Sequence, residues 1–229
     1  MSIFKGVALV TGAASGIGRE TILSFAREGC KRLVLVDRDA GKLRETEKTI
    51  AEVLKGQTFQ TISVPTDISK EREIDSLYNS VIGEFGRVDY VVNAAGLYTW
   101  KISLLQTLTV VRPGFRGSIV NIASQLGIVG RPAAPAYCGS KAAVISMTRC
   151  DAIDYSKDLI RVNAVCPGLI DTAMTRPQAD VLSPAINIAP MGRMGTAQEV
   201  ADCVLFLASS KASFVQGATM VVDGGYVIN

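Results

Sequence analysis

Short apolar runs alternate with longer amphipathic stretches along the chain. Seven runs rich in Val, Ile and Leu predict strands, at 7–12, 33–38, 61–67, 88–96, 117–124, 160–168 and 219–225. Five stretches with helical spacing of their apolar residues predict helices, at 16–28, 40–54, 70–85, 136–157 and 196–208. Most of the strand segments are apolar nearly throughout, which is typical of a parallel sheet that helices cover on both faces. The pattern therefore predicts an α/β fold, a doubly wound seven-stranded parallel sheet in a single domain.

Composition and charge narrow the class of protein. The chain has 229 residues, 48% of them apolar, and a formal net charge of +3, as in a soluble globular domain. The basic residues form no run, so we expect no nucleic-acid partner. No apolar run reaches the roughly 20 residues that a membrane span needs, and the N-terminus has no signal-peptide pattern. The five cysteines are widely spaced and form no CxxC pair, so we expect reduced thiols, no metal site and a cytoplasmic location.

The chain contains no histidine, which excludes a Ser-His-Asp triad, a Cys-His pair and a histidine-ligated metal. Tyr137 and Lys141 lie four residues apart in a predicted helix and so share one face. A free tyrosine has a pKa of about 10, and a nearby positive charge favours its ionised form. Taken alone, the pair is better explained as a buried tyrosine and a solvated lysine. Ser124 ends the preceding predicted strand, at the sheet edge where open α/β folds bind ligands, and favours a catalytic group.

A glycine-rich turn, TGAASGIG at 11–18, follows the first predicted strand and opens the first helix. Such glycines let the chain turn sharply and let a phosphate approach the N–H groups of a helix N-terminus. Asp37, at the end of the second strand, can accept hydrogen bonds from both ribose hydroxyls of NAD and would repel a 2′-phosphate. Its alternative role is that of a helix N-cap. Arg38 beside it can instead hold the 2′-phosphate of NADP, so we favour NAD and leave NADP open.

Several motifs occur in one order along almost the whole chain. TGAASGIG is followed by Asp67, NAAG at 93–96, Ser124, YCGSK at 137–141, PGLIDT at 167–172 and DGG at 223–225. In this order the motifs resemble the short-chain dehydrogenase/reductase family, whose fold is Rossmann-like. The resemblance implies a cofactor-binding half at about 1–96 and a catalytic and substrate half at about 97–229.

The resemblance also implies a role for each motif. Ser124 would orient the substrate oxygen, Tyr137 would act as the general acid or base, and Lys141 would bind the nicotinamide ribose and tune Tyr137. Asn93 would stabilise the central strand and line the cofactor groove, and Asn163 is expected to be structural. The cofactor-binding residues that it implies are Gly12, Ser15, Gly16, Ile17, Gly18, Asp37, Arg38, Asp67 (adenine), Ile68, Asn93, Ala94, Gly96, Tyr137, Lys141, Pro167, Gly168, Ile170 and Thr172, the last two at the nicotinamide carboxamide.

The implied activity is hydride exchange between NAD(P) and a small or medium-sized secondary alcohol or ketone, in a homodimer or homotetramer. Two alternatives remain: a homologue that binds the cofactor without turnover, and an NADP-dependent ketoreductase of the same architecture. The segment 97–116 keeps the first alternative open, because it is short for the family and lacks the asparagine that usually joins the Ser-Tyr-Lys group.

That segment has room for one short apolar helix, within 101–111, which we expect to pack against the sheet and another subunit. The span 170–190, which forms a lid in the family, is also a few residues short. Either the protein has a reduced substrate side, or residues of the full chain are missing from the sequence here.

Overall fold

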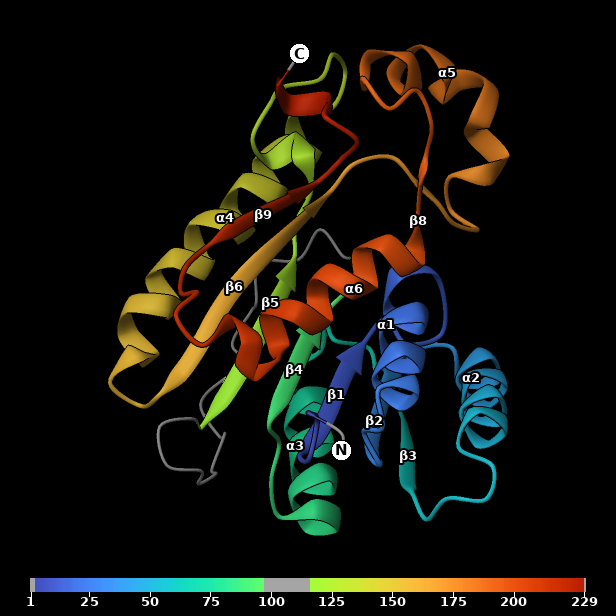
Figure 1. Cartoon of the computed structure of the whole chain (residues 1–229), viewed down its shortest axis with the longest axis vertical. Helices are drawn as coiled ribbons and strands as arrows, with labels where there is room; N and C mark the ends of the chain where they lie inside the picture. Colours follow the sequence, from blue (N-terminus) through green and yellow to red (C-terminus); the bar gives the residue numbers. More distant parts are fainter. Residues whose placement is uncertain (1–2, 97–115, 229) are drawn as a thin grey trace.

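A seven-stranded sheet runs through the centre of the molecule (Figure 1). The computed structural model describes residues 3–96 and 116–228. The strands lie in the order β3-β2-β1-β4-β5-β6-β9, and every neighbouring pair is parallel. Their bounds are β1 Val7–Thr11, β2 Arg32–Asp37, β3 Gln60–Pro65, β4 Tyr90–Asn93, β5 Gly117–Ile122, β6 Ile160–Pro167 and β9 Thr219–Val222. The predicted doubly wound parallel sheet is confirmed.

Helices cover both faces of this sheet. On one face lie α1 (Gly16–Arg27), α2 (Ala40–Val53) and α6 (Ala197–Ala208), and on the other lie α3 (Glu71–Phe85) and α4 (Pro135–Ser156). Strand β1 is buried along its whole length, and its alternate side chains enter different cores. Ala8 and Val10 pack with α1, α2 and α6, whereas Val7 and Leu9 pack with α3 and α4. This double burial explains why the strands are apolar throughout.

All seven predicted strands and five predicted helices are present, but several strands end earlier than expected. The predicted strand at 88–96 is observed at Tyr90–Asn93, and that at 219–225 is observed at Thr219–Val222. The residues lost at these strand ends belong to the motif segments 94–96 and 223–225, which leave the sheet at its carboxyl edge. The prediction there was wrong because motif residues that follow each strand were counted as part of it.

Some elements were not predicted. Strand β7 (Ile170–Asp171) pairs with β8 (Gly195–Thr196), and α5 (Ala179–Ile188) follows β7. Two-residue strands are too short to leave a periodic pattern, and Pro184 lies inside α5, where proline normally argues against a helix. Short 3₁₀ turns complete the set: η1 Gln125–Gly127, η2 Arg176–Gln178, η3 Ser210–Ala212 and η4 Tyr226–Ile228. The helix expected within 101–111 lies outside the described residues.

The C-terminal DGG motif packs against the chain that follows α5. The backbone N–H of Met191 donates to the carbonyl of Gly224 at 3.1 Å. Gly225 has φ of +91°, and a Cβ on it would lie 3.0 Å from the ring of Pro190. Asp223 holds the turn together by accepting from the N–H groups of Gly225 and Val227. The tail is therefore fastened to the segment between α5 and β8.

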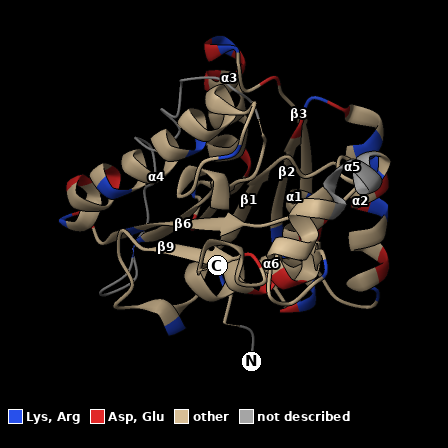
Figure 2. Cartoon of the chain, turned by 90° about the horizontal axis from the view of Figure 1, so that it is seen from above, with Lys and Arg blue, Asp and Glu red and all other residues tan. Residues whose placement is uncertain are grey.

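Charged side chains of both signs lie on the outer helices and loops, and in the view of Figure 2 blue and red segments alternate. No helix in the described residues combines the length and apolar character needed to cross a membrane. The five cysteines are free thiols. Within residues 3–96 and 116–228, no cluster of three or more His, Cys, Asp or Glu side chains could hold a metal ion.

A buried carboxylate joins the start of β1 to the start of β4. Asp89 is 1% exposed, and its Oδ2 accepts from the Val7 N–H at 2.8 Å and from Nε of Arg87 at 3.0 Å. The second oxygen, Oδ1, pairs with Nη2 of Arg87. A Cβ on Gly6 would lie 2.2 Å from Cγ of Asp89, so the carboxylate fits only against a glycine.

We expect Asp89→Ala to lower the free energy of unfolding by about 3 kcal/mol, because it leaves the Val7 N–H and the Arg87 guanidinium without their acceptor. Urea denaturation measures this loss. Glu20→Ala is the matched control, since the Glu20–Arg27 ion pair lies on the surface and its loss should cost less than about 1 kcal/mol. Equal losses in the two variants would contradict a special role for Asp89.

Candidate active site

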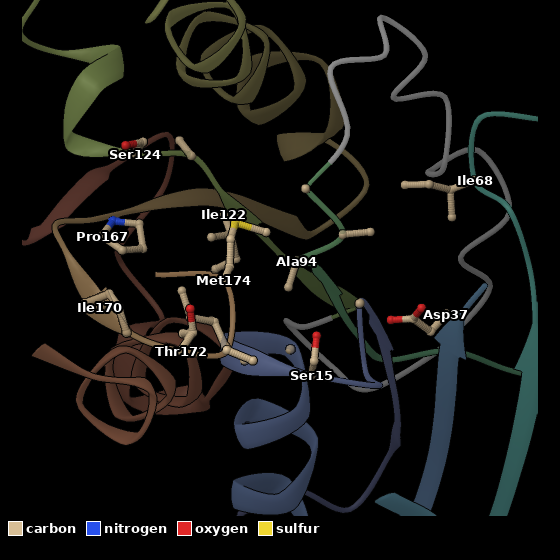
Figure 3. Close-up of a pocket in the computed structure, with 18 of the residues that line it drawn as sticks. Ser15, Asp37, Ile68, Ala94, Ile122, Ser124, Pro167, Ile170, Thr172 and Met174 are labelled. Carbon is tan, nitrogen blue, oxygen red and sulfur yellow. The ribbon is translucent and has the colours of Figure 1, made fainter. Parts of the chain in front are cut away.

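A groove of about 370 Å³ opens at the carboxyl ends of the strands. It lies where the chain connections diverge, with β1, β2 and β3 on one side and β4, β5 and β6 on the other. Such a switch point is where open α/β sheets bind ligands. All the predicted site residues border this groove except Asn93. Figure 3 shows Asp37 at one end and Ser124 and Pro167 at the other, with Ser15 between them.

The glycine-rich turn is built on backbone contacts too close for side chains. Gly12 has φ of +73°, and a Cβ on it would lie 2.9 Å from the Ala95 nitrogen. A Cβ on Gly18 would lie 2.2 Å from the carbonyl oxygen of Gly12. These two glycines let α1 start directly against β1 and let β1 lie against the loop after β4. The start of α1 therefore faces the groove.

The first turn of α1 has N–H groups that no side chain caps. Ser15 is the N-cap residue, but its side chain makes no capping hydrogen bond, and the first turn contains no acidic residue. Thr172 lies next to this first turn, because a Cβ built on Gly16 would lie 3.5 Å from Cγ2 of Thr172. Uncapped N–H groups and the positive end of the helix dipole favour a bound anion at this point.

Asp37 lies at the end of β2, with its carboxylate held by the backbone. Oδ2 accepts from the Ala14 N–H at 3.2 Å, and Oδ1 accepts from the Asp39 N–H at 3.1 Å. The N-cap of α2 is Asp39, whose side chain accepts from the Lys42 N–H. The alternative role of Asp37 as that N-cap is therefore wrong. Arg38 also borders the groove with an exposed side chain.

Asp67 and Ile68 border the same end of the groove from the loop after β3. Asp67 accepts from both the N–H and the hydroxyl of Ser69, and these hydrogen bonds hold the pKa of its carboxyl below the ordinary value. Lys70 and Arg38 lower the pKa further through their charge. The carboxylate is thus an oriented hydrogen-bond acceptor.

Asn93 does not border the groove, which corrects part of its expected role. Its Nδ2 donates to Oδ1 of Asn121 at 2.8 Å, and Nδ2 of Asn121 donates in turn to Oγ1 of Thr148 at 2.9 Å. The side chain thus joins β4 to β5 and, through Asn121, to α4. Asn163 likewise uses its amide on the backbone of Val215 and Ala218, consistent with the structural role expected for it.

Ser124 lies just beyond β5 and is 7% exposed. It is the N-cap of η1, and its Oγ accepts from the Leu126 N–H at 3.1 Å. This bond leaves the hydroxyl proton of Ser124 to donate elsewhere. The turn therefore fixes the position of a hydroxyl donor at the groove.

Tyr137 and Lys141 reach the groove from the first turns of α4, which starts at Pro135. Nζ of Lys141 lies 5.8 Å from the centre of the Tyr137 ring and donates to the Ile122 carbonyl at 3.1 Å. Burial lowers the pKa of Lys141 below its ordinary value. The structure thus brings the predicted serine, tyrosine and lysine together at one end of the groove.

Several residues that border the groove were not predicted. They are Val36, Thr66, Ala95, Ile122, Ala123, Ala173, Met174 and Thr175. Most contribute backbone or apolar surface beside a predicted residue, so neighbouring motif positions would have found them. Met174 and Thr175 belong to the loop after β7, and Met174 is 77% exposed. In that loop, the hydroxyl of Thr175, three residues after Thr172, was the one chemical feature that could have marked a groove residue in the sequence.

Comparisons with known proteins agree with this architecture. A family model described as short chain dehydrogenase matches residues 6–112, and one described as Enoyl-(Acyl carrier protein) reductase matches residues 102–227. Cis-4-hydroxycyclohexanecarboxylate dehydrogenase of Sinomonas cyclohexanicum is 35% identical over 244 aligned positions, which cover 96% of each chain. Because 96% of 229 residues is about 220, at least about 24 of those positions have no counterpart in this chain.

Two solved structures are also similar. The crystal structure of levodione reductase superposes with a TM-score of 0.83 at 30% identity, and covers 98% of this chain and 99% of its own. That of L-sorbose reductase from Gluconobacter frateurii, complexed with NADPH and L-sorbose, gives a TM-score of 0.83 at 26% identity and covers 100% and 99%. Sequence, fold and groove agree, and the chain belongs to the short-chain dehydrogenase/reductase family.

Proposed function

We propose that this chain is an NAD(P)-dependent oxidoreductase that interconverts a secondary alcohol and a ketone. One observation carries the proposal: Ser124, Tyr137 and Lys141 border the same groove as the glycine-rich turn. A hydroxyl donor, a phenol and an ammonium at one end, with an anion-binding helix start further along, are the parts that hydride transfer to or from a dinucleotide needs.

The residues present fit a dinucleotide cofactor. The uncapped start of α1, approached over Gly12 and Gly16, suits a pyrophosphate. Asp37 suits the ribose diol and Asp67 the amino group of adenine, since both are fixed hydrogen-bond acceptors. Ile170 and Thr172, at the end of the groove near Ser124 and Pro167, are assigned to the nicotinamide carboxamide (Figure 3). Bound there, NAD(P) would supply the hydride donor or acceptor.

Asp37 favours NAD over NADP. Its carboxylate is held in place by two backbone N–H groups, where it would repel a 2′-phosphate. Arg38 argues in the other direction, because its exposed side chain borders the groove and makes no ion pair within the described part of the chain. The NADPH in the L-sorbose reductase structure supports NADP as a possible cofactor of this architecture. We assign NAD as the preferred cofactor.

The three side chains near α4 would handle the substrate oxygen and its proton. Ser124 keeps its hydroxyl proton for donation to that oxygen, since its Oγ already accepts from Leu126. Tyr137 would give its proton to the oxygen during ketone reduction and take it back during alcohol oxidation. Lys141, held by the Ile122 carbonyl, places a positive charge beside the ring, which favours the phenolate that must form.

A cofactor-binding homologue without turnover is the alternative from a different functional class. The absence of an asparagine in 97–116 and the gaps in the alignment to the dehydrogenase relative favour it. The proton relay of the family normally includes that asparagine. Dinucleotide binding measured by calorimetry, without oxidation or reduction of any member of a panel of secondary alcohols and ketones, would support this alternative.

We further propose that the protein is a cytoplasmic homodimer or homotetramer that acts on a small molecule. Helix α4 carries Ile153 with 77% of its surface exposed, at the end of the helix remote from Tyr137. An apolar residue that exposed on a long helix suits a contact with a second copy of the chain.

Tyr137→Phe should lower kcat about 10²–10⁴-fold, because it removes the group that exchanges the substrate proton. The measurement is NADH absorbance during a screen of secondary alcohols and ketones. Tyr155→Phe in the same helix is the matched control and should change kcat less than about threefold, because Tyr155 does not border the groove. Turnover by Tyr137→Phe at a rate near that of the wild type would rule out the mechanism.

Asp37→Ser should shift the ratio of kcat/KM for NADPH over NADH upward by about tenfold or more, because it removes a negative charge from the 2′-phosphate position. Arg38→Ala should shift the ratio the other way. Asp39→Ser keeps a capping side chain on α2 and does not border the groove, so it should leave the ratio unchanged. An unchanged ratio in Asp37→Ser would refute the assignment of NAD to this carboxylate.

Ile153→Glu should weaken the oligomer, because a charge would be buried in an apolar contact between subunits. Light scattering coupled to size-exclusion chromatography, run over a range of protein concentrations, reports the mass. Lys48→Glu on the exposed side of α2 should leave the mass unchanged. A wild-type protein that is monomeric at all concentrations would contradict the oligomer itself.

A further inference from the structure

The hydroxyl of Thr175 lies among four hydrogen-bonding atoms at the wall of the groove. The Thr172 N–H donates to Oγ1 of Thr175 at 3.0 Å, and Oγ1 of Thr172 lies 3.2 Å from the same atom. The carbonyl oxygens of Ile170 and Thr172 lie 2.5 Å and 3.2 Å from it. A hydroxyl has one proton and two lone pairs, so these four contacts allow few arrangements.

The proton of Thr175 goes to the Ile170 carbonyl. Of the two possible acceptors, the Ile170 oxygen lies 2.5 Å from Oγ1 of Thr175 and the Thr172 oxygen lies 3.2 Å from it, a difference of 0.7 Å. The competing carbonyl, of Thr172, already accepts from the N–H groups of Thr175 and Arg176, at 3.1 Å and 3.0 Å. Both of its lone pairs are therefore in use, whereas the Ile170 contact lies within the range for an O–H donor, at its short end.

The remaining contacts then fix the hydroxyl of Thr172. One lone pair of Thr175 accepts from the Thr172 N–H. With its own proton on Ile170, Thr175 can meet Oγ1 of Thr172 only as an acceptor, so Thr172 must donate its hydroxyl proton to Thr175. Both donors of Thr172 are thus spent within the loop. Its Oγ1 can offer only lone pairs to a ligand.

We infer that Thr175 is a positioning residue that makes Thr172 a pure hydrogen-bond acceptor, so that this wall of the groove selects an N–H donor. The inference rests on the proposed function, in which Thr172 borders the nicotinamide carboxamide. The NH₂ end of the carboxamide then faces Thr172, which fixes the rotation of the amide. A dinucleotide with a carboxylate in place of the carboxamide would bind less well, because the lone pairs of the carboxylate would face those of Oγ1 of Thr172.

The test compares two dinucleotides that differ only in this group, NAD and nicotinic acid adenine dinucleotide, by calorimetry. The wild-type protein should bind NAD at least about tenfold more tightly than the acid analogue. Thr175→Val removes the acceptor and returns the hydroxyl and N–H protons of Thr172 to the groove, so the preference should fall by about fivefold or more. Thr175→Ser keeps the hydroxyl and should keep the preference within about twofold.

ADP-ribose separates failure of this inference from failure of the proposed function. It lacks the nicotinamide, so its affinity should be the same in the wild type, Thr175→Val and Thr175→Ser. If the wild type binds neither ADP-ribose nor NAD, the proposed function is wrong, and this inference falls with it. If ADP-ribose binds equally to all three while Thr175→Val keeps the full preference for NAD, only the inference is overturned.

A loop displaced by the valine would show as weaker binding of ADP-ribose. In that case Thr172→Val carries the test, because it removes the acceptor oxygen itself and should abolish the preference for NAD while ADP-ribose binds normally. A preference that survives this substitution would overturn the inference equally well.

Discussion

The close approach of backbone to backbone between β1, the start of α1 and the loop after β4 is the constraint on which the site depends. Thr11 ends β1, and its Oγ1 accepts from the N–H groups of both Ala94 and Ala95. Gly12 and Gly18 keep the same space clear of side chains. Because β1 and β4 are neighbours with connections that leave in opposite directions, this contact sets the floor of the groove and the position of α1 above it.

Because all strands of the sheet are parallel, residues that follow different strands in the sequence lie close together at the carboxyl edge. Residues as far apart as Asp37, Ser124 and Thr172 border one groove because each follows the carboxyl end of a strand or lies at the adjoining loop. The helix α4 then adds Tyr137 and Lys141 from the side. Burial disfavours the charge of Lys141, and within the described residues its ammonium donates to one carbonyl, that of Ile122. A buried ionisable group whose pKa is shifted is typical of a functional position.

The sequence predicted the sheet, the five helices on its faces and almost every residue that borders the groove. These features could be predicted because apolar strands and glycine-containing motifs can each be identified from a short stretch of sequence. It did not predict that the amide of Asn93 turns toward Asn121, because that choice depends on a neighbouring strand 28 residues away in sequence. It also did not predict β7, β8 or α5. The two short strands are stabilised by pairing with each other, and Pro184 within α5 is a residue that normally argues against a helix. The hydrogen-bond pattern around Thr175 depends on the bend of one loop and has no periodic signature.

The attachment of the C-terminal tail to the chain after α5 couples two parts that are separate in sequence. Met191 donates to Gly224, and Gly225 lies so near Pro190 that a Cβ would come within 3.0 Å of the proline ring. Any displacement of that segment must therefore displace the tail as well. The tail can therefore report on that segment: a fluorinated tyrosine at Tyr226 would register a movement of the chain between α5 and β8 without a label in that chain.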